Sequence, residues 1–212
     1  MMLQKKITFI LILFSCFTMV GVTLLKNDAF ATPDPTEQFR PFLKKVTDVL
    51  ADPGLKTLPK NEQGRRIINV VKEHFDFREM SKRVLGQQWR ELNDSQQKEF
   101  EDLFTRMLQY AYIGKIDDYT GQKVEFTQQR VKGDRAEVQT LLVDKDKSVA
   151  VSYIMLLRGE QWMAYDVVVE NVSLIRNYME QFREILKKDG YTGLVAQVKA
   201  KISEIENENK HN

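Results

Sequence analysis

The chain has 212 residues, of which 42% are hydrophobic, 29% charged and 10% aromatic, a composition typical of a globular protein rather than a disordered or fibrous one. Its 32 basic and 30 acidic residues nearly cancel, and a net charge of +2 argues against a nucleic-acid partner, which usually requires a clear basic excess. One cysteine and two histidines exclude a disulfide framework, a thiolate metal cluster and a histidine-rich metal site, so we expect no bound metal.

Residues 1–31 have the order of a secretory signal peptide. The pair Lys5-Lys6 precedes a mostly apolar stretch over residues 7–25, and Ala29-Phe30-Ala31 forms a small-x-small cleavage pattern. We therefore expect cleavage after this pattern and export of the mature chain. An uncleaved membrane anchor is the alternative, because the apolar stretch is long enough to span a bilayer. A lipoprotein attached at Cys16 is the least favoured reading, because mostly apolar residues follow it.

One domain is expected over residues 32–205, followed by a polar tail over residues 206–212. Apolar residues at spacings of three and four predict four helices in the first half of this domain. The predicted helices cover residues 39–50, a second stripe from Ile67 to Phe75, a short third helix over 77–85, and a long fourth helix that is capped by Asn93-Asp94-Ser95 and carries apolar residues from Phe100 to Tyr112.

The second half of the domain begins with strands. Four runs of strand type cover residues 122–131, 135–143, 148–157 and 162–169, and short polar turns join them, which predicts an antiparallel meander. A further helix is expected from Ser173, with a break at Gly190 and one more helix after it. The order of elements predicts an α+β fold in which a curved four-stranded antiparallel sheet is wrapped by about six helices.

No group of residues assembles a catalytic site. His74 and Asp76 could form an acid–base pair, but no nucleophile signature accompanies them, so local hydrogen bonds are the favoured interpretation. Asp166 alternates with apolar neighbours in a strand, where a carboxylate could orient a substrate, although a structural hydrogen bond to a nearby loop or helix N-terminus is favoured. Because glycine-rich phosphate loops and metal motifs are also missing from the sequence, we expect neither an enzyme nor a cofactor.

Four stretches, in order along residues 37–202, resemble the MlaC family, also called the toluene-tolerance auxiliary family. Asn171 and Met179 depart from its pattern, since the family usually has Gly and Arg at these positions. The stretches are His74-Phe75-Asp76-Phe77 with Met80, Val84-Leu85-Gly86 and Trp89-Arg90; Gln96-Gln97 with Phe100, Phe104 and Leu108; Trp162 with Tyr165-Asp166-Val167; and Val172-Ser173-Leu174 with Asn177-Tyr178 and Gln181-Phe182.

The resemblance implies a periplasmic carrier that takes phospholipid between an outer-membrane lipoprotein complex and an inner-membrane ABC transporter with its anchored substrate-binding subunit. Such carriers maintain outer-membrane lipid asymmetry and solvent tolerance. The family resemblance also implies a fold like that of nuclear transport factors. A related branch is associated with hopanoid biosynthesis, so an accessory factor that binds a polycyclic lipid is the alternative, and an adaptor with a filled core is a further one.

A carrier must hide acyl chains from water, and two chains of about fourteen methylenes each represent about 20 kcal/mol of hydrophobic free energy. We therefore expect an apolar cavity between the sheet and the flanking helices, although the same residues would also suit a filled core. Headgroup selectivity is expected to be low, because the sequence shows no cluster of basic residues that would bind a phosphate. The residues expected in the cavity wall are Phe77, Val84, Leu85, Trp89, Phe104, Leu108, Tyr112, Val151, Tyr153, Met155, Tyr165, Val167, Val169, Leu174, Tyr178 and Phe182.

Overall fold

The computed structural model describes residues 32–113, 119–145 and 147–211. The chain divides into two units, Met1–Thr32 and Pro33–Asn212, and the description below concerns the second. The predicted signal peptide over residues 1–31 and its cleavage site lie outside the described residues.

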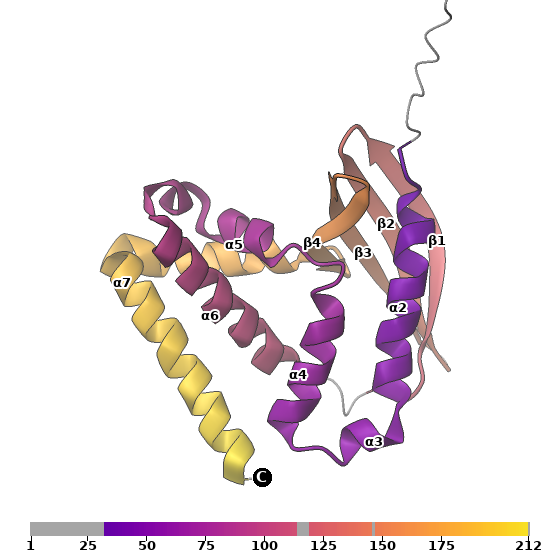
Figure 1. The fold of residues 1–212 in the computed structure, drawn as a ribbon, viewed down its shortest axis with the longest axis horizontal. Coiled ribbons are helices and arrows are strands. Elements are labelled where there is room, and N and C mark those ends of the chain that lie inside the picture. The colour runs from indigo at the N-terminus through magenta and orange to yellow at the C-terminus, as the bar shows by residue number, and fades with distance from the viewer. Residues whose placement is uncertain (1–31, 114–118, 146, 212) are drawn as a thin grey trace, which may run out of the picture. The chain divides into compact units, whose positions relative to one another are not determined.

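The first helices begin where the sequence supplies capping side chains. Helix α2 (Pro35–Ala51) starts after Asp34, whose carboxylate accepts a hydrogen bond from the backbone N–H of Glu37. Asp52 ends this helix and in the same way caps the short helix α3 (Pro53–Lys56). Helix α4 (Lys60–Val71) follows and runs back beside α2 (Figure 1).

Helix α4 ends earlier than the sequence pattern predicts. The predicted continuation to Phe75 is wrong: residues 72–74 form turns, and Phe75 forms a parallel β-bridge with Ala164. The backbone N–H of Ala164 donates to the carbonyl of His74 at 2.7 Å, and the N–H of Asp76 donates to the carbonyl of Ala164 at 2.8 Å. Pairing with a strand edge therefore satisfies backbone groups that would otherwise continue the helix.

The next helices also have side-chain caps. Asp76 caps helix α5 (Phe77–Leu85) through the N–H of Glu79, and a 3-10 helix, η1 (Gly86–Glu91), follows it. Helix α6 (Asp94–Ile113) has a reciprocal cap, in which Asn93 and Gln96 each accept a hydrogen bond from the other residue's backbone N–H at 2.9–3.0 Å.

Over the described residues, the sheet has five antiparallel strands in the order β1-β2-β3-β4-β5. The predicted meander is confirmed, and the additional strand β5 is only two residues long, too short for a periodicity to show. Register shifts between Phe126 and Gln128 and between Ile154 and Met155 interrupt the regular pairing. The strands are β1 (Lys123–Lys132), β2 (Arg135–Asp144), β3 (Lys147–Arg158), β4 (Gln161–Val169) and β5 (Val172–Ser173).

Helix α7 (Leu174–His211) consists of two helices that meet at Gly190, where the backbone is not helical. The second half packs along α6, as Figure 1 shows. Three contacts hold it there: Lys199 pairs with Glu99 at 2.6 Å, and Glu206 accepts hydrogen bonds from Arg106 and Tyr110. The part of the chain expected to be a polar tail thus begins with a residue bound to α6.

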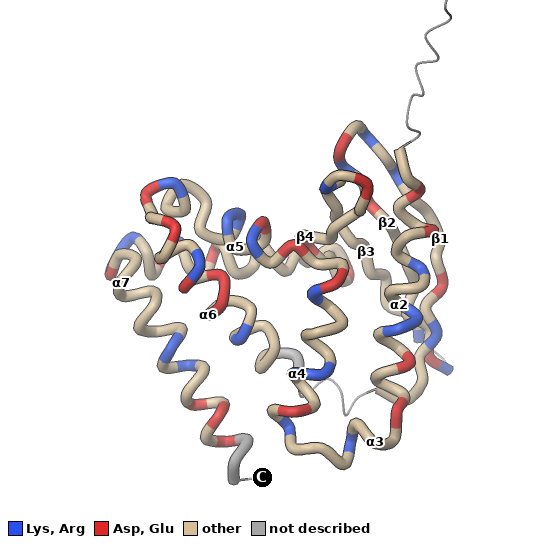
Figure 2. Tube along the Cα trace, viewed as in Figure 1, with Lys and Arg blue, Asp and Glu red and all other residues tan. Residues whose placement is uncertain are grey.

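The sheet is covered on both faces. On one face α2 contributes Phe39 and Phe42 to a core with Met155 and Trp162 of the sheet. On the other face α5, α6 and α7 pack their apolar sides together and against Leu156 and Tyr165. The predicted α+β fold of a sheet wrapped by six α-helices is therefore confirmed for the described residues. Figure 2 shows basic and acidic residues interspersed along the helices that cover the sheet.

Candidate functional site

An apolar cavity of about 580 Å³ lies between α4, the start of α7 and the strand β4 with its neighbour β5. The cavity is partly open to solvent, and its volume lies in the range of sites that bind small organic ligands. We call it the apolar chamber. Its lining residues are Leu50, Gly64, Ile67, Ile68, Val71, Phe75, Phe77, Met80, Leu108, Gln109, Val167, Val169, Val172, Leu174 and Asn177.

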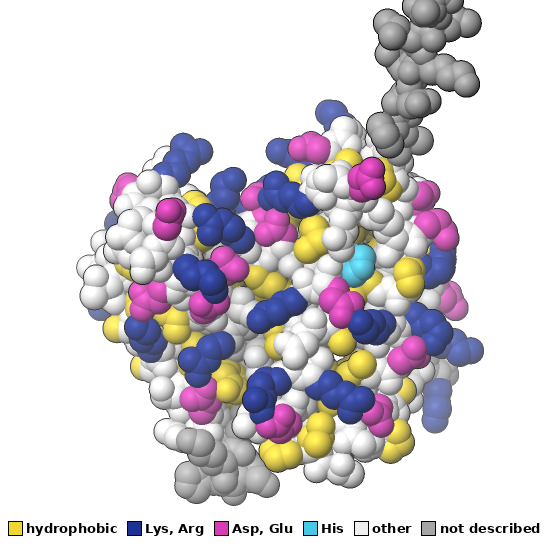
Figure 3. Space-filling view, in the orientation of Figure 1, with side chains coloured by type: hydrophobic (Ala, Val, Ile, Leu, Met, Phe, Trp, Pro, Cys, Tyr) yellow, Lys and Arg dark blue, Asp and Glu magenta, His cyan; other side chains and the backbone are white. Residues whose placement is uncertain are grey.

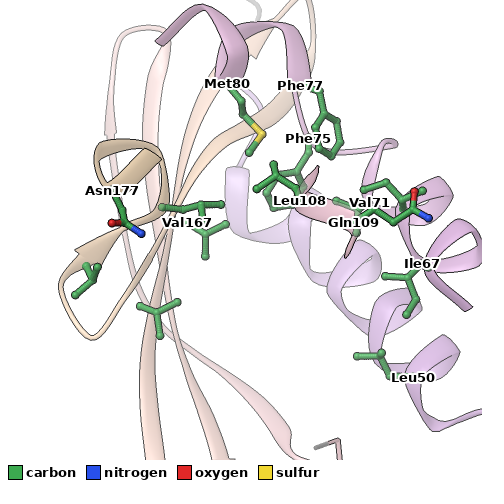
Figure 4. A pocket seen from close by; sticks show the side chains of 15 residues that line it. Leu50, Ile67, Val71, Phe75, Phe77, Met80, Leu108, Gln109, Val167 and Asn177 are labelled. Atoms are coloured by element: carbon green, nitrogen blue, oxygen red, sulfur yellow. The ribbon is translucent and has the colours of Figure 1, made fainter. Parts of the chain in front are cut away.

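The walls of the apolar chamber come from different elements of the fold (Figure 4). Val167 of β4 and Asn177 of α7 lie on one side of the chamber, and Ile67 and Val71 of α4 lie on the other. Helical spacing explains the second wall, because Ile67 and Val71 are four residues apart and so project from the same face of α4. Leu108 of α6 lies between the two sides.

Among the residues that the structure describes, none that lines the apolar chamber carries a charge, and the polar side chains in this lining are the amides of Gln109 and Asn177. This lining offers few hydrogen-bond partners to a ligand. A polar ligand would therefore lose its hydrogen bonds to water without replacing them, which is costly. The chamber is suited instead to a hydrocarbon chain, whose transfer out of water is favourable by about 0.8 kcal/mol per methylene.

Exposed valines mark the mouth of the chamber. The side chains of Val169 and Val172 are 41% and 63% exposed, respectively, whereas Met80 and Leu108 are buried. Two hydrogen bonds between Glu170 and Ala150 hold the turn between β4 and β5 in place. The Glu170 N–H donates to the Ala150 carbonyl, and the Glu170 carboxylate accepts from the Ala150 N–H, both at 3.0 Å. Figure 3 shows small hydrophobic groups among charged side chains of both signs on one face of the molecule.

The residues predicted for the cavity wall fall into several groups. Phe77, Leu108, Val167, Val169 and Leu174 line the chamber. Tyr153 and Met155 instead belong to the core under α2, on the opposite face of the sheet. Val151 is half-buried and does not line the chamber, and the Tyr112 side chain lies outside the described part of the structure. The remaining predicted residues pack in the core formed by α5, α6 and α7: Val84, Leu85, Trp89, Phe104, Tyr165, Tyr178 and Phe182.

Helix α4 lines the apolar chamber, although none of its residues was predicted to border the cavity. Its residues Ile67, Ile68 and Val71 have the spacing of an apolar helix face, which is the signal that was available. That spacing does not distinguish a face packed on the sheet from a face that borders a cavity. The chamber exists because α4 packs mainly on α2 and α6 and leaves space between itself and β4.

The candidate acid–base residues have structural roles. The carboxylate of Asp76 caps α5 and accepts a hydrogen bond from Arg158 Nε at 3.0 Å. The ring of His74 packs against Phe39 and Phe42, and its buried Nδ1 has no hydrogen-bond partner among the described residues. Burial lowers the pKa of His74, which favours the neutral ring.

The favoured interpretation of Asp166 is confirmed. Its carboxylate accepts hydrogen bonds from the hydroxyl of Ser173 at 2.6 Å and from the backbone N–H of Ile175 at 3.0 Å. Ser173 directly precedes α7 and Ile175 lies in its first turn, so the strand residue caps the helix that forms one side of the chamber.

Within the residues that the structure describes, no group of three or more His, Cys, Asp or Glu side chains has the arrangement of a metal site. Over the same residues, no helix is both long enough and apolar enough to cross a bilayer.

An α+β domain with a large chamber, lined by apolar and uncharged residues over the part of the chain that the structure describes, is the architecture of a protein that binds an apolar or amphipathic ligand. The family model described as MlaC protein matches residues 41–200, and the chain belongs to this family.

Two known proteins are similar to the chain. The intermembrane phospholipid transport system binding protein MlaC of Haemophilus influenzae is 22% identical over 129 residues, which cover 58% of this chain and 60% of that protein. The match therefore spans about three fifths of the relative's length. A phospholipid-binding protein from Ralstonia solanacearum, solved in complex with a phospholipid, has the same fold, with a TM-score of 0.73 at 20% identity over 82% of this chain and 99% of that chain.

Proposed function

We propose that this protein binds phospholipid and carries it through an aqueous compartment, with the acyl chains held in the apolar chamber. The observation that carries the proposal is a chamber of about 580 Å³ whose described lining residues are all uncharged. The names of the Haemophilus relative and of the Ralstonia structure, both of which refer to phospholipid, support the same class of ligand.

The physical need for such a chamber follows from the cost of exposing acyl chains to water. Two chains of about fourteen methylenes each would lose about 20 kcal/mol of hydrophobic free energy on leaving a membrane, so unassisted transfer is very slow. The chamber offsets part of this cost, while its open mouth leaves a route for entry and release. Binding and release need no chemical change in the cargo, so the proposal includes no catalytic step and no cofactor.

The proposed compartment is the periplasm, which the chain would reach by means of a cleaved signal peptide over residues 1–31. There the carrier would exchange phospholipid with an outer-membrane lipoprotein complex and with an inner-membrane ABC transporter through its anchored substrate-binding subunit. This exchange would maintain the lipid asymmetry of the outer membrane and tolerance to solvents. The second candidate is an accessory factor of an exported pathway such as hopanoid biosynthesis or transport, because the chamber's uncharged lining would also suit a polycyclic lipid.

Extraction of the purified protein into organic solvent, followed by mass spectrometry, tests this function. We expect phospholipid in stoichiometric amount, and native mass spectrometry should show the same lipid bound to the folded chain. A polycyclic lipid in the extract would favour the second candidate. A protein that carries no lipid after purification and acquires none from phospholipid vesicles would contradict the carrier function.

A further inference from the structure

One lining residue of the apolar chamber has no side chain. Gly64 is buried in α4 and is the single glycine among the described residues that line the chamber. It lies within the helical span of α4, a backbone conformation that does not require glycine. Glycine also weakens a helix relative to alanine, because its backbone loses more freedom on folding. The local structure therefore gives no reason for a glycine at this position.

A side chain at position 64 would project into the chamber. Ile67, Ile68 and Val71 follow Gly64 at spacings of three, four and seven residues, so all four residues lie on one face of α4. The three apolar side chains line the chamber together with Gly64 itself. Any side chain introduced at position 64 would therefore occupy space that now belongs to the chamber.

The face of α4 that carries Gly64 lies away from the mouth. Val167 of β4 lies on the side of the chamber where the exposed valines form the mouth, whereas Ile67 and Leu50 lie on the opposite side (Figure 4). Both Leu50 and Ile67 pack against the buried Leu55 of α3, so packed side chains lie behind this side of the chamber. An acyl chain that enters at the mouth would bring its terminal part to the wall formed by α4.

The chamber is small relative to the acyl chains of a phospholipid. A methylene group occupies about 27 Å³, slightly less than the share of a water molecule in the liquid. A volume of about 580 Å³ would therefore hold roughly twenty methylenes, fewer than two chains of about fourteen methylenes contain. Space in the chamber thus limits how much of the cargo can be sheltered from water.

We propose that Gly64 determines the acyl-chain length that the chamber accepts, because its missing side chain leaves room for the terminal methylenes of the cargo. The inference rests on the proposed function and adds a residue that sets the choice among phospholipids. An alanine methyl group would take the room of about one methylene, and a leucine side chain the room of about four. Each methylene that finds no room would stay in water, which lowers binding by up to about fourfold.

Uptake from vesicles that contain lipids of different chain length tests this proposal. Fluid vesicles of one host phospholipid would contain equal minor amounts of phosphatidylethanolamines whose two chains have ten, twelve, fourteen, sixteen or eighteen carbons. The purified protein would be incubated with them and reisolated, and its lipids would be quantified by mass spectrometry. The ten-carbon lipid is the reference, because its roughly sixteen methylenes fit the chamber in the native protein and in the variants.

Two substitutions of different size should change the lipids that are carried. Relative to the ten-carbon lipid, uptake of the longer lipids should fall by about twofold to fourfold in Gly64→Ala and by more than tenfold in Gly64→Leu, compared with the native protein. Gly64→Ala should also raise the midpoint of thermal unfolding by roughly 1–4 °C, because alanine is the better helix former. A more stable protein that carries shorter lipids is a combination that a purely structural role of Gly64 does not produce.

The matched control is Asn69→Ala in the same helix. Asn69 is exposed and does not line the chamber, and its replacement also puts alanine in place of a weaker helix former. This variant should be at least as stable as the native protein and should carry the same distribution of chain lengths. Circular dichroism would establish that every variant is folded, and Gly64→Ala alone decides the question if Gly64→Leu does not fold.

Two results would overturn the proposal. Variants at position 64 that acquire the same distribution of chain lengths as the native protein would show that this position does not limit the cargo. A lower unfolding midpoint of Gly64→Ala with unchanged chain lengths would show that a close neighbour within the protein, rather than the cargo, requires glycine there. Native protein that acquires no lipid at all would contradict the proposed function itself, which is a distinguishable result.

Discussion

The hydroxyl of Ser173 donates a 2.6 Å hydrogen bond to the carboxylate of Asp166, which joins the strand β4 to the residue that directly precedes α7. The same carboxylate accepts the N–H of Ile175, and the Ser173 hydroxyl in turn accepts the N–H of Arg176. One buried side chain therefore sets the position of the helix that carries Asn177 into the apolar chamber.

Replacement of Asp166 by Ala should lower the free energy of unfolding by about 1–3 kcal/mol, because the change leaves a helix N-terminus without its cap and buried donors without acceptors. Chemical denaturation would measure the loss. Asp48→Ala is the control, since Asp48 forms only an exposed ion pair with Lys44 and its removal should cost less than about 0.5 kcal/mol. Equal effects of the two variants would contradict the capping role.

The order of helices and strands could be predicted from the sequence because each element shows its own period and its own caps. Helix α6 begins at the predicted Asn93 cap, and α7 begins after Ser173 as expected. Four differences remain. Phe75 leaves the helical pattern to pair with Ala164, and β5, α3 and η1, with two to six residues each, are too short to show a period.

The cavity wall was much less predictable, because both faces of the sheet are apolar. Met155 and Leu156 are consecutive and both buried, one in the core under α2 and the other in the core with α6 and α7. Alternation along such a strand cannot show which face borders a cavity.

Two valines of almost equal exposure provide a test of the apolar chamber. Val169 is 41% exposed at its mouth, and Val131 is 45% exposed on β1 outside it. Val169→Asp should weaken phospholipid binding by about tenfold or more, because a carboxylate at the mouth would have to lose water against an acyl chain. Val131→Asp should bind as the native protein does. Lipid transfer from vesicles, quantified by mass spectrometry, compares them, and identical transfer by both variants would exclude Val169 from the binding site.

Gly190 allows α7 to change direction and pack along α6. Its φ of 66° and ψ of −172° fall in a region that is almost restricted to glycine, so Gly190→Ala should lower the free energy of unfolding by about 1–3 kcal/mol. Thermal or chemical unfolding would measure the effect. Thr192→Ala changes an exposed residue two positions later and should have an effect within about 0.5 kcal/mol. If Gly190→Ala is as stable as the Thr192 variant, the backbone conformation at residue 190 does not require glycine.

His74 should make stability depend on pH. Burial against Phe39 and Phe42 lowers its pKa from 6.5, an effect that nearby Lys45 reinforces and that Glu73 and the backbone of Trp162 oppose. The unfolded chain therefore binds a proton more readily than the folded chain as the pH falls.

The stability that the neutral ring of His74 provides is complete above about pH 6.5 and is lost as the pH falls through this value towards the lower pKa of the folded state. Chemical denaturation between about pH 8 and about pH 5 should show a smaller loss of unfolding free energy in His74→Gln than in the native protein, because glutamine does not titrate. Parallel curves for the two proteins over this range would mean that the ring has the same proton affinity in the folded and unfolded states.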